Sequence, residues 1–150
     1  MKQNWSVYLV MAAGLVSCRT ADVIAPPISE QLALSVQERT PDSGEQVPRV
    51  TITGTQGAIT VAVTRRGMCN TVVDAGINRA PGELAVVARM LPSTILRGCS
   101  MIVTVIDYSG TITDLPAGNY RVRVFEAVGP DQPRLIGSAS VSTHGTIAIH

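Results

Sequence analysis

Hydrophobic side chains alternate with polar or small ones along much of this chain, which is the pattern of half-buried β-strands. The alternation begins at residues 32–36 and stops at a polar stretch, residues 40–48. It resumes at residues 50–52 and again at residues 59–63, with a Thr-Gln-Gly sequence between these two runs. Two such runs joined by turn residues predict a β-hairpin.

Further short apolar runs predict the remaining strands. They lie at residues 71–73, 84–90, 101–106, 120–128, 135–141 and 146–149. Residues 75–82 and 91–98 are predicted to be loops, and the run at 84–90 would also fit one or two helical turns. Many short strands separated by turn residues are typical of an all-β sandwich. We therefore predict an antiparallel β-sandwich of about seven to nine strands over residues 31–150.

A local motif supports this fold. The stretch Leu-Pro-Ala-Gly-Asn-Tyr at residues 115–120 leads into alternating valines, Val122 and Val124. It resembles the turn before a late strand in bacterial immunoglobulin-like and prealbumin-like domains. The resemblance implies an immunoglobulin-like sandwich in which Tyr120 buries its ring and returns its hydroxyl to a backbone group, as a tyrosine corner does. It carries no activity, because a fold does not determine a function.

The first residues have the features of an export signal. Lys2 supplies a positive charge, residues 6–17 form a short apolar region, and small residues precede Cys18. This pattern resembles the lipobox of bacterial lipoproteins, which implies cleavage after residue 17 and a lipid on Cys18. The resemblance also implies an outer-membrane destination, since Arg19 stands where retained lipoproteins often have Asp. An ordinary secretory signal and an uncleaved anchor helix remain the alternatives.

Two proline residues inside the next stretch, residues 18–30, predict an extended tether between the anchor and the domain. At about 3.1 Å per residue it could hold the domain up to roughly 35–40 Å from a bilayer.

Removal of the signal changes the composition. The only lysine leaves with it, so eleven of the 12 basic residues remain against 11 acidic ones. A domain with no net side-chain charge lacks the basic field that dominates nucleic-acid binding. Only Tyr108, Tyr120 and Phe125 remain as aromatic residues. This depletion argues against base stacking and against a carbohydrate-binding aromatic platform.

Cys69 and Cys99 are the other two cysteines. If the chain is exported and Cys18 carries a lipid, the two remaining cysteines are predicted to form a disulfide. On the chain-entropy model, such a loop stabilises a fold by roughly 3–4 kcal/mol. Two buried free thiols or a metal pair are the alternatives, although no Cys-x-x-Cys motif is present.

Sequence motifs for catalysis are lacking, and we expect no enzymatic activity, no metal and no cofactor. Arg121 and Arg123 share one face of a predicted strand and are candidates for a partner contact, with Arg65 and Arg66 as further ones. Their more ordinary role is a solvated strand face, paired with Glu126 or Asp107.

Two functional hypotheses follow. The first is a non-enzymatic, lipid-anchored envelope module that binds another envelope protein and no nucleic acid. The second is an exported enzyme or small-ligand carrier whose site forms only in three dimensions. A deep pocket lined by converging acidic or histidine side chains would favour the second, and a filled core the first.

Overall fold

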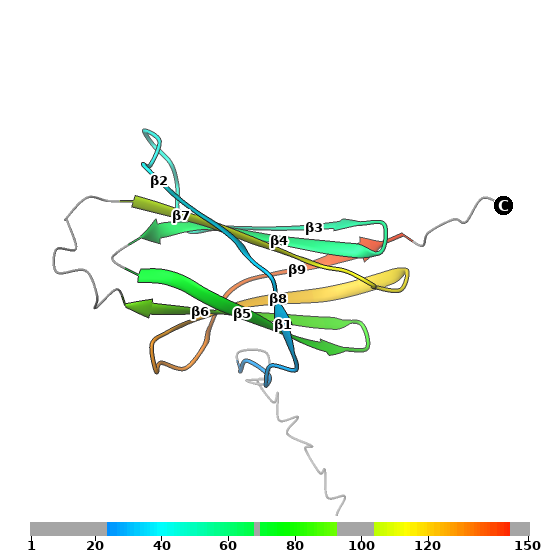
Figure 1. The fold of residues 1–150 in the computed structure, drawn as a ribbon. Helices are drawn as coiled ribbons and strands as arrows, with labels where there is room; N and C mark the ends of the chain where they lie inside the picture. The colour runs from blue at the N-terminus through cyan, green and yellow to red at the C-terminus, as the bar shows by residue number, and fades with distance from the viewer. Residues whose placement is uncertain (1–23, 68–69, 93–103, 145–150) are drawn as a thin grey trace, which may run out of the picture.

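The computed structural model describes residues 24–67, 70–92 and 104–144. Nine strands in this part of the chain form two sheets packed face to face (Figure 1). In chain order they are β1 (Glu30–Leu32), β2 (Ser35–Arg39), β3 (Arg49–Thr55), β4 (Ala58–Gly67), β5 (Asn70–Ala80), β6 (Glu83–Pro92), β7 (Thr104–Ile112), β8 (Gly118–Val128) and β9 (Arg134–Thr143). The described residues contain no helix with the length and apolar character to span a bilayer.

The strand order confirms the predicted β-sandwich. One sheet has five strands in the order β1-β5-β6-β8-β9, and the other has four in the order β2-β7-β4-β3. Every pairing is antiparallel except that of β6 with β8. The chain leaves the five-stranded sheet after β6, forms β7 in the other sheet and returns as β8. This crossover allows β8 to run parallel to β6, which no tight hairpin could do.

The core lies between the sheets and follows the period of two along each strand. On β4 the buried side chains are Ile59, Val61 and Val63, and on β8 they are Val122 and Val124. Tyr120 packs against the same core and donates its hydroxyl to the Pro116 carbonyl oxygen at 2.9 Å. The predicted inward face of β8 and the predicted tyrosine contact are both confirmed.

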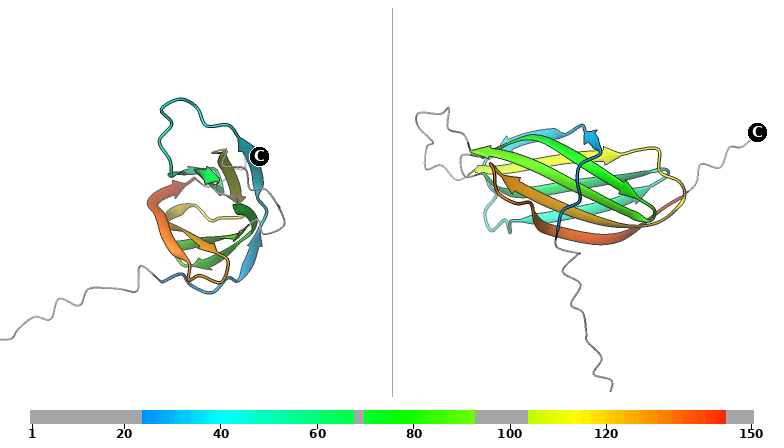
Figure 2. Two further views of the ribbon diagram at one scale, coloured as in Figure 1. Left: turned by 90° about the vertical axis from the view of Figure 1, so that its left-hand side faces the viewer. Right: turned by 90° about the horizontal axis from the view of Figure 1, so that it is seen from below.

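The two sheets also approach each other along one side, where their edge strands β3 and β9 lie together. A side chain on Gly54 of β3 would collide with the carbonyl oxygen of Ser142 on β9. Val50 lies against Gly137 of β9 in the same way. Seen end-on, the strands form a nearly closed outline (Figure 2, left). Glycine therefore makes the close approach of the two edges possible.

On the opposite side the chain switches sheets between β1 and β2. Leu32 is buried and Leu34 packs on the core, but Val36 is exposed. The alternation at residues 32–36 predicted a single strand containing all three positions. The break at residues 33–34 ends that single alternation, because β1 pairs with β5 and β2 pairs with β7.

One loop prediction is wrong. Residues 75–82 were expected to form a loop, yet β5 runs through Ala80 and buries Ala75 and Ile77. The alanine, glycine and asparagine residues of this stretch are typical of a turn, but in the structure they are held in a strand between β1 and β6. In the structure, Gly76 leaves room for the Ile28 side chain, which a Cβ at this position would overlap.

Other strand boundaries also shift. The predicted strand at 101–106 overlaps β7, which continues to Ile112, and the predicted run at 59–63 lies within β4, which continues through Arg65 and Arg66 to Gly67. Residues 84–90 form part of β6 rather than a helical turn. Their apolar run is continuous because both faces of β6 are buried. The predicted strand at 146–149 lies outside the described residues.

The described end of the predicted tether packs on the domain. Ser29 donates its backbone N–H to the Ile77 carbonyl oxygen at 2.9 Å, and Asn78 donates its side-chain amide to the Pro27 carbonyl oxygen at 2.8 Å. Ala25 packs beside Phe125 on the outer face of the five-stranded sheet. Figure 2 (right) shows this segment crossing that face. The folded unit therefore reaches further toward the N-terminus than residue 31.

Candidate functional site: a buried arginine–glutamate pair

Two charged side chains point into the sandwich near one of its ends. Arg65 follows Ile59, Val61 and Val63 on the inward face of β4, and Glu126 follows Val124 on the inward face of β8. Strand geometry places alternate residues on one face, so these two charges face each other across the two layers. Their side chains retain only 20% and 11% exposure.

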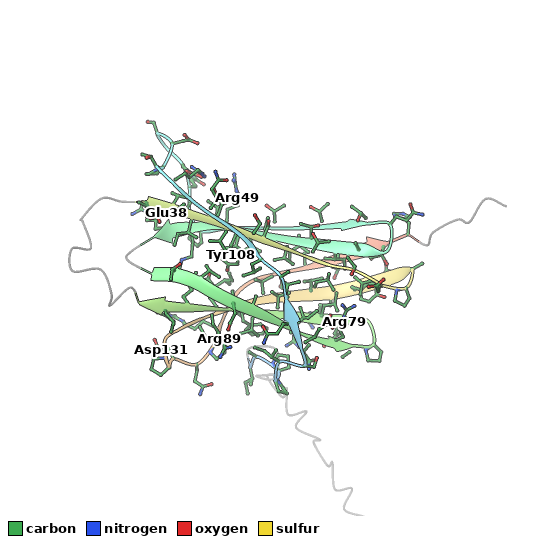
Figure 3. The ribbon with its side chains drawn as sticks, viewed as in Figure 1. Glu38, Arg49, Arg79, Arg89, Tyr108 and Asp131 are labelled. Atoms are coloured by element: carbon green, nitrogen blue, oxygen red, sulfur yellow. The ribbon has the colours of Figure 1, made fainter. Side chains whose placement is uncertain are left out.

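Hydrogen bonds fix this pair. Arg65 Nη1 lies 2.6 Å from Glu126 Oε2, and the Tyr108 hydroxyl donates to Glu126 Oε1 at 2.6 Å. Arg65 Nη1 also lies 2.6 Å from the sulfur of Met90 on β6. Tyr108 is held between the two layers of strands (Figure 3). We call these four residues the polar cluster; its members come from β4, β6, β7 and β8.

The environment keeps Tyr108 protonated. Burial raises the pKa of the Tyr108 hydroxyl well above its ordinary value, and the negative charge of Glu126 raises it further. Tyr108 is therefore a hydrogen-bond donor throughout the physiological range. Each oxygen of Glu126 accepts one hydrogen bond, from Arg65 or from Tyr108. The arrangement is a fixed charge pair.

A groove opens from the polar cluster to solvent and has a volume of about 460 Å³. Its aliphatic walls come from Pro48, Val128, Leu135 and Ile136. Its polar lining consists of Arg65, Glu126, Asp131, Gln132 and Arg134. A neighbouring hollow of about 210 Å³ shares part of this wall and adds Val47 and Arg66. Small-ligand sites are typically about 300–1,000 Å³, so the groove is large enough for one.

The β8–β9 pairing shapes one wall of the groove. Phe125 pairs with Leu135 while Val124 pairs with Gly137, so Ile136 is an extra residue on β9. Such a bulge re-aims the side chains beside it. Leu135 is 37% exposed at this wall, and Ile136 packs on the core.

A second charged cluster lies on the outer face of the four-stranded sheet. Arg39 contacts Asp107 through Nε at 2.6 Å and Glu45 through Nη1 at 2.8 Å. Asp107 also accepts the Thr64 hydroxyl at 2.7 Å. The hydrogen bonds from Arg39 lower the pKa of Glu45 to about 2. This cluster ties residues 40–48 to the sheet and leaves its own charges mutually satisfied.

The predicted contact residues Arg121 and Arg123 do share the outer face of β8. Arg123 is mostly covered, with its guanidinium carbon 5.8 Å from the centre of the Phe125 ring and Nη2 3.5 Å from Glu83 Oε2. Glu126 cannot pair with either arginine, because it lies on the opposite face of the strand. Asp107 pairs with Arg39 instead.

Cys18, Cys69 and Cys99 lie outside the described residues, so the predicted lipid attachment and disulfide stay predictions. Within the ranges that the structure describes, no group of three or more histidine, cysteine or acidic side chains is placed to hold a metal ion.

Sequence reasoning missed Tyr108 and Met90 as members of the polar cluster. Sequence analysis also placed Glu126 on the solvated face as a partner for the arginines, although its position shares the parity of the inward-facing Tyr120, Val122 and Val124. An inward carboxylate needs a cation or a donor. Which residue supplies it depends on strand pairing across the sandwich, which local sequence does not give.

Comparisons of the chain with protein-family models, with curated proteins and with solved structures found no match.

Proposed function

We propose that this chain is a lipid-anchored envelope protein whose β-sandwich is a non-enzymatic binding module. The observation that carries the proposal is the groove, in which a fixed Arg65–Glu126 pair lies beside aliphatic walls. A hollow that combines convergent polar groups with aliphatic walls is typical of recognition sites. The Glu126 carboxylate is occupied by Arg65 and Tyr108, which favours binding over acid–base catalysis.

The anchor is proposed to be the lipid on Cys18, in the outer membrane. Because the chain is packed on the domain from Ala25 onward, only the link from Cys18 to Ile24 would separate the lipid from the folded unit. A fully extended link of this length spans about 20 Å. The module would therefore stay close to the bilayer, and its partner would be a membrane or envelope protein.

Capture from native membranes tests the binding function. Full-length wild-type protein, Leu135→Glu and the control Thr53→Glu would be compared; Leu135 is at the groove wall, and Thr53 is exposed on the outer face of β3. We expect one partner to be retained by wild type and by Thr53→Glu, and lost with Leu135→Glu. The same set of captured proteins with all three chains would contradict a role for the groove.

A further inference from the structure

The groove has the chemistry of a site for an organic anion. Among the described residues, no hydrogen bond uses Nη2 of Arg65, whose Nε contacts the Arg66 carbonyl oxygen and whose Nη1 contacts Glu126 and Met90. Arg65 lines both the groove and the neighbouring hollow. Its position is already set by Glu126, so Nη2 can donate to a ligand at little cost in side-chain entropy.

The charges around the two hollows also favour an anion. Three arginines, Arg65, Arg66 and Arg134, line them together with two carboxylates, Glu126 and Asp131. One positive charge is therefore left over, which one negative charge on a ligand would balance. Guanidinium groups bind carboxylates strongly because they offer parallel N–H donors.

The aliphatic walls of the groove indicate the chemistry of the uncharged part of the ligand. Pro48, Val128, Leu135 and Ile136 line the groove beside the charged groups, and no aromatic side chain is among the described lining residues. An aliphatic chain next to the anionic group would bury its surface there. We propose that the groove binds a carboxylate that carries an aliphatic chain. This inference rests on the proposed binding function and names the chemistry of its ligand.

Two sources offer this chemistry, the C-terminal carboxylate of an apolar peptide and a free short-chain acid. The full chain, purified in dodecyl maltoside, would be titrated calorimetrically with acetyl-Ala-Val-Leu as its free acid and as its amide. Hexanoate and hexanamide form the second pair of probes. We expect the acid to bind at least about tenfold more tightly than the amide in one or both pairs. A preference in the peptide pair alone identifies a peptide end, and one in the hexanoate pair identifies a free acid. No preference in either pair would overturn the proposal.

Variants assign the preference to the groove. Arg134→Gln, at an exposed position, should weaken binding of the acid about three- to tenfold and leave the amide unchanged. The double variant Arg65→Gln/Glu126→Gln removes both buried charges together, so no unpaired charge is left, and should abolish the preference for the acid. The control is Arg79→Gln, at the opposite end of the sandwich from Asp131 (Figure 3). Unchanged acid binding by Arg134→Gln and by the double variant would contradict the assignment.

The capture experiment separates this inference from the proposed function. If Leu135→Glu loses the partner but no probe shows a preference, the binding function stands and the carboxylate chemistry is wrong. If the probes bind as expected but no partner depends on Leu135, the carboxylate site stands and the protein-binding function is wrong.

Discussion

The hydroxyl of Tyr108 and the carboxylate of Glu126 join the two sheets through a hydrogen bond of 2.6 Å. Tyr108 belongs to β7 in the four-stranded sheet, and Glu126 belongs to β8 in the five-stranded sheet. The same carboxylate pairs with Arg65. This contact therefore holds the groove's charge pair in place and links the fold to the proposed site.

Removing the Tyr108 hydroxyl should destabilise the domain. Tyr108→Phe leaves a nearly buried carboxylate with one donor fewer, which should cost about 1–3 kcal/mol of unfolding free energy. Tyr120→Phe is the matched control, because its hydroxyl bonds a carbonyl oxygen at an exposed site and should contribute only about 0.5–1.5 kcal/mol. Chemical denaturation measures both. A silent Tyr108→Phe variant, or one less destabilised than Tyr120→Phe, would show that the contact does not join the sheets.

The close approach of β3 and β9 should be sensitive to a single methyl group. In Gly54→Ala the new Cβ meets the Ser142 carbonyl oxygen, so the edges must separate at a cost of about 1–3 kcal/mol. Gly118→Ala is the control, because the nearest atom to its added Cβ is 3.9 Å away. Thermal unfolding of the two variants compares them. Equal midpoints would mean that the two edges are not in contact.

Acid should weaken the cluster around Arg39. The pKa of Glu45 is about 2 in the folded protein, below its ordinary value of 4.5. A lowered folded pKa stabilises the protein above the ordinary value, and this contribution is lost as the pH falls from about 4.5 to 2. The lowered pKa of Asp107 acts in the same direction.

We therefore expect Glu45→Gln to reduce stability at neutral pH and to flatten the loss of stability between about pH 4.5 and 2. Glu38→Gln, on the exposed face of β2, is the control for loss of one negative charge. Urea denaturation at several pH values measures the slope. An acid slope in Glu45→Gln as steep as that of wild type would exclude this role.

The cysteine pair should be oxidised. Gly67 pairs with Thr104 and Asn70 pairs with Pro92, so the two connections that carry Cys69 and Cys99 begin and end on paired residues. A bridge between them should contribute roughly 3–4 kcal/mol, and reduction should lower the unfolding midpoint. Non-reducing peptide mapping should recover the two cysteines in one linked peptide. Thiol labelling of both cysteines in unfolded, unreduced protein would refute the disulfide.

Period-two alternation predicted the two-layer fold and the inward face of β8, because exposing Tyr120, Val122 and Val124 together would be costly. The alternation did not predict most of β5. The small and polar residues of this strand pair with β1 on one side and β6 on the other, and Gly76 accommodates the Ile28 side chain. A local pattern cannot reveal that a segment such as Ile28 will cover a sheet face.

The candidate site shows the same limit. Residue parity places Arg65 and Glu126 inside the sandwich once β4 is seen to extend to Gly67, but the sequence pattern alone left both residues on a solvated face. Their pairing, 61 residues apart, depends on the order of strands in the two sheets. The contributions of Tyr108 and Met90 depend on it as well. Alternation along a strand therefore indicates which residues share a face, whereas the order of strands in the two sheets determines which of these residues meet in the site.

The proposed compartment, anchoring and class of partner all depend on a lipid on Cys18, so the mature N-terminus tests the proposed function most directly. Mass spectrometry of protein from native membranes should find an N-terminal peptide that begins at Cys18 and carries acyl chains. Cys18→Ser should move the protein to the soluble fraction. An unmodified N-terminal peptide, together with an unchanged membrane fraction for Cys18→Ser, would contradict the lipid anchor.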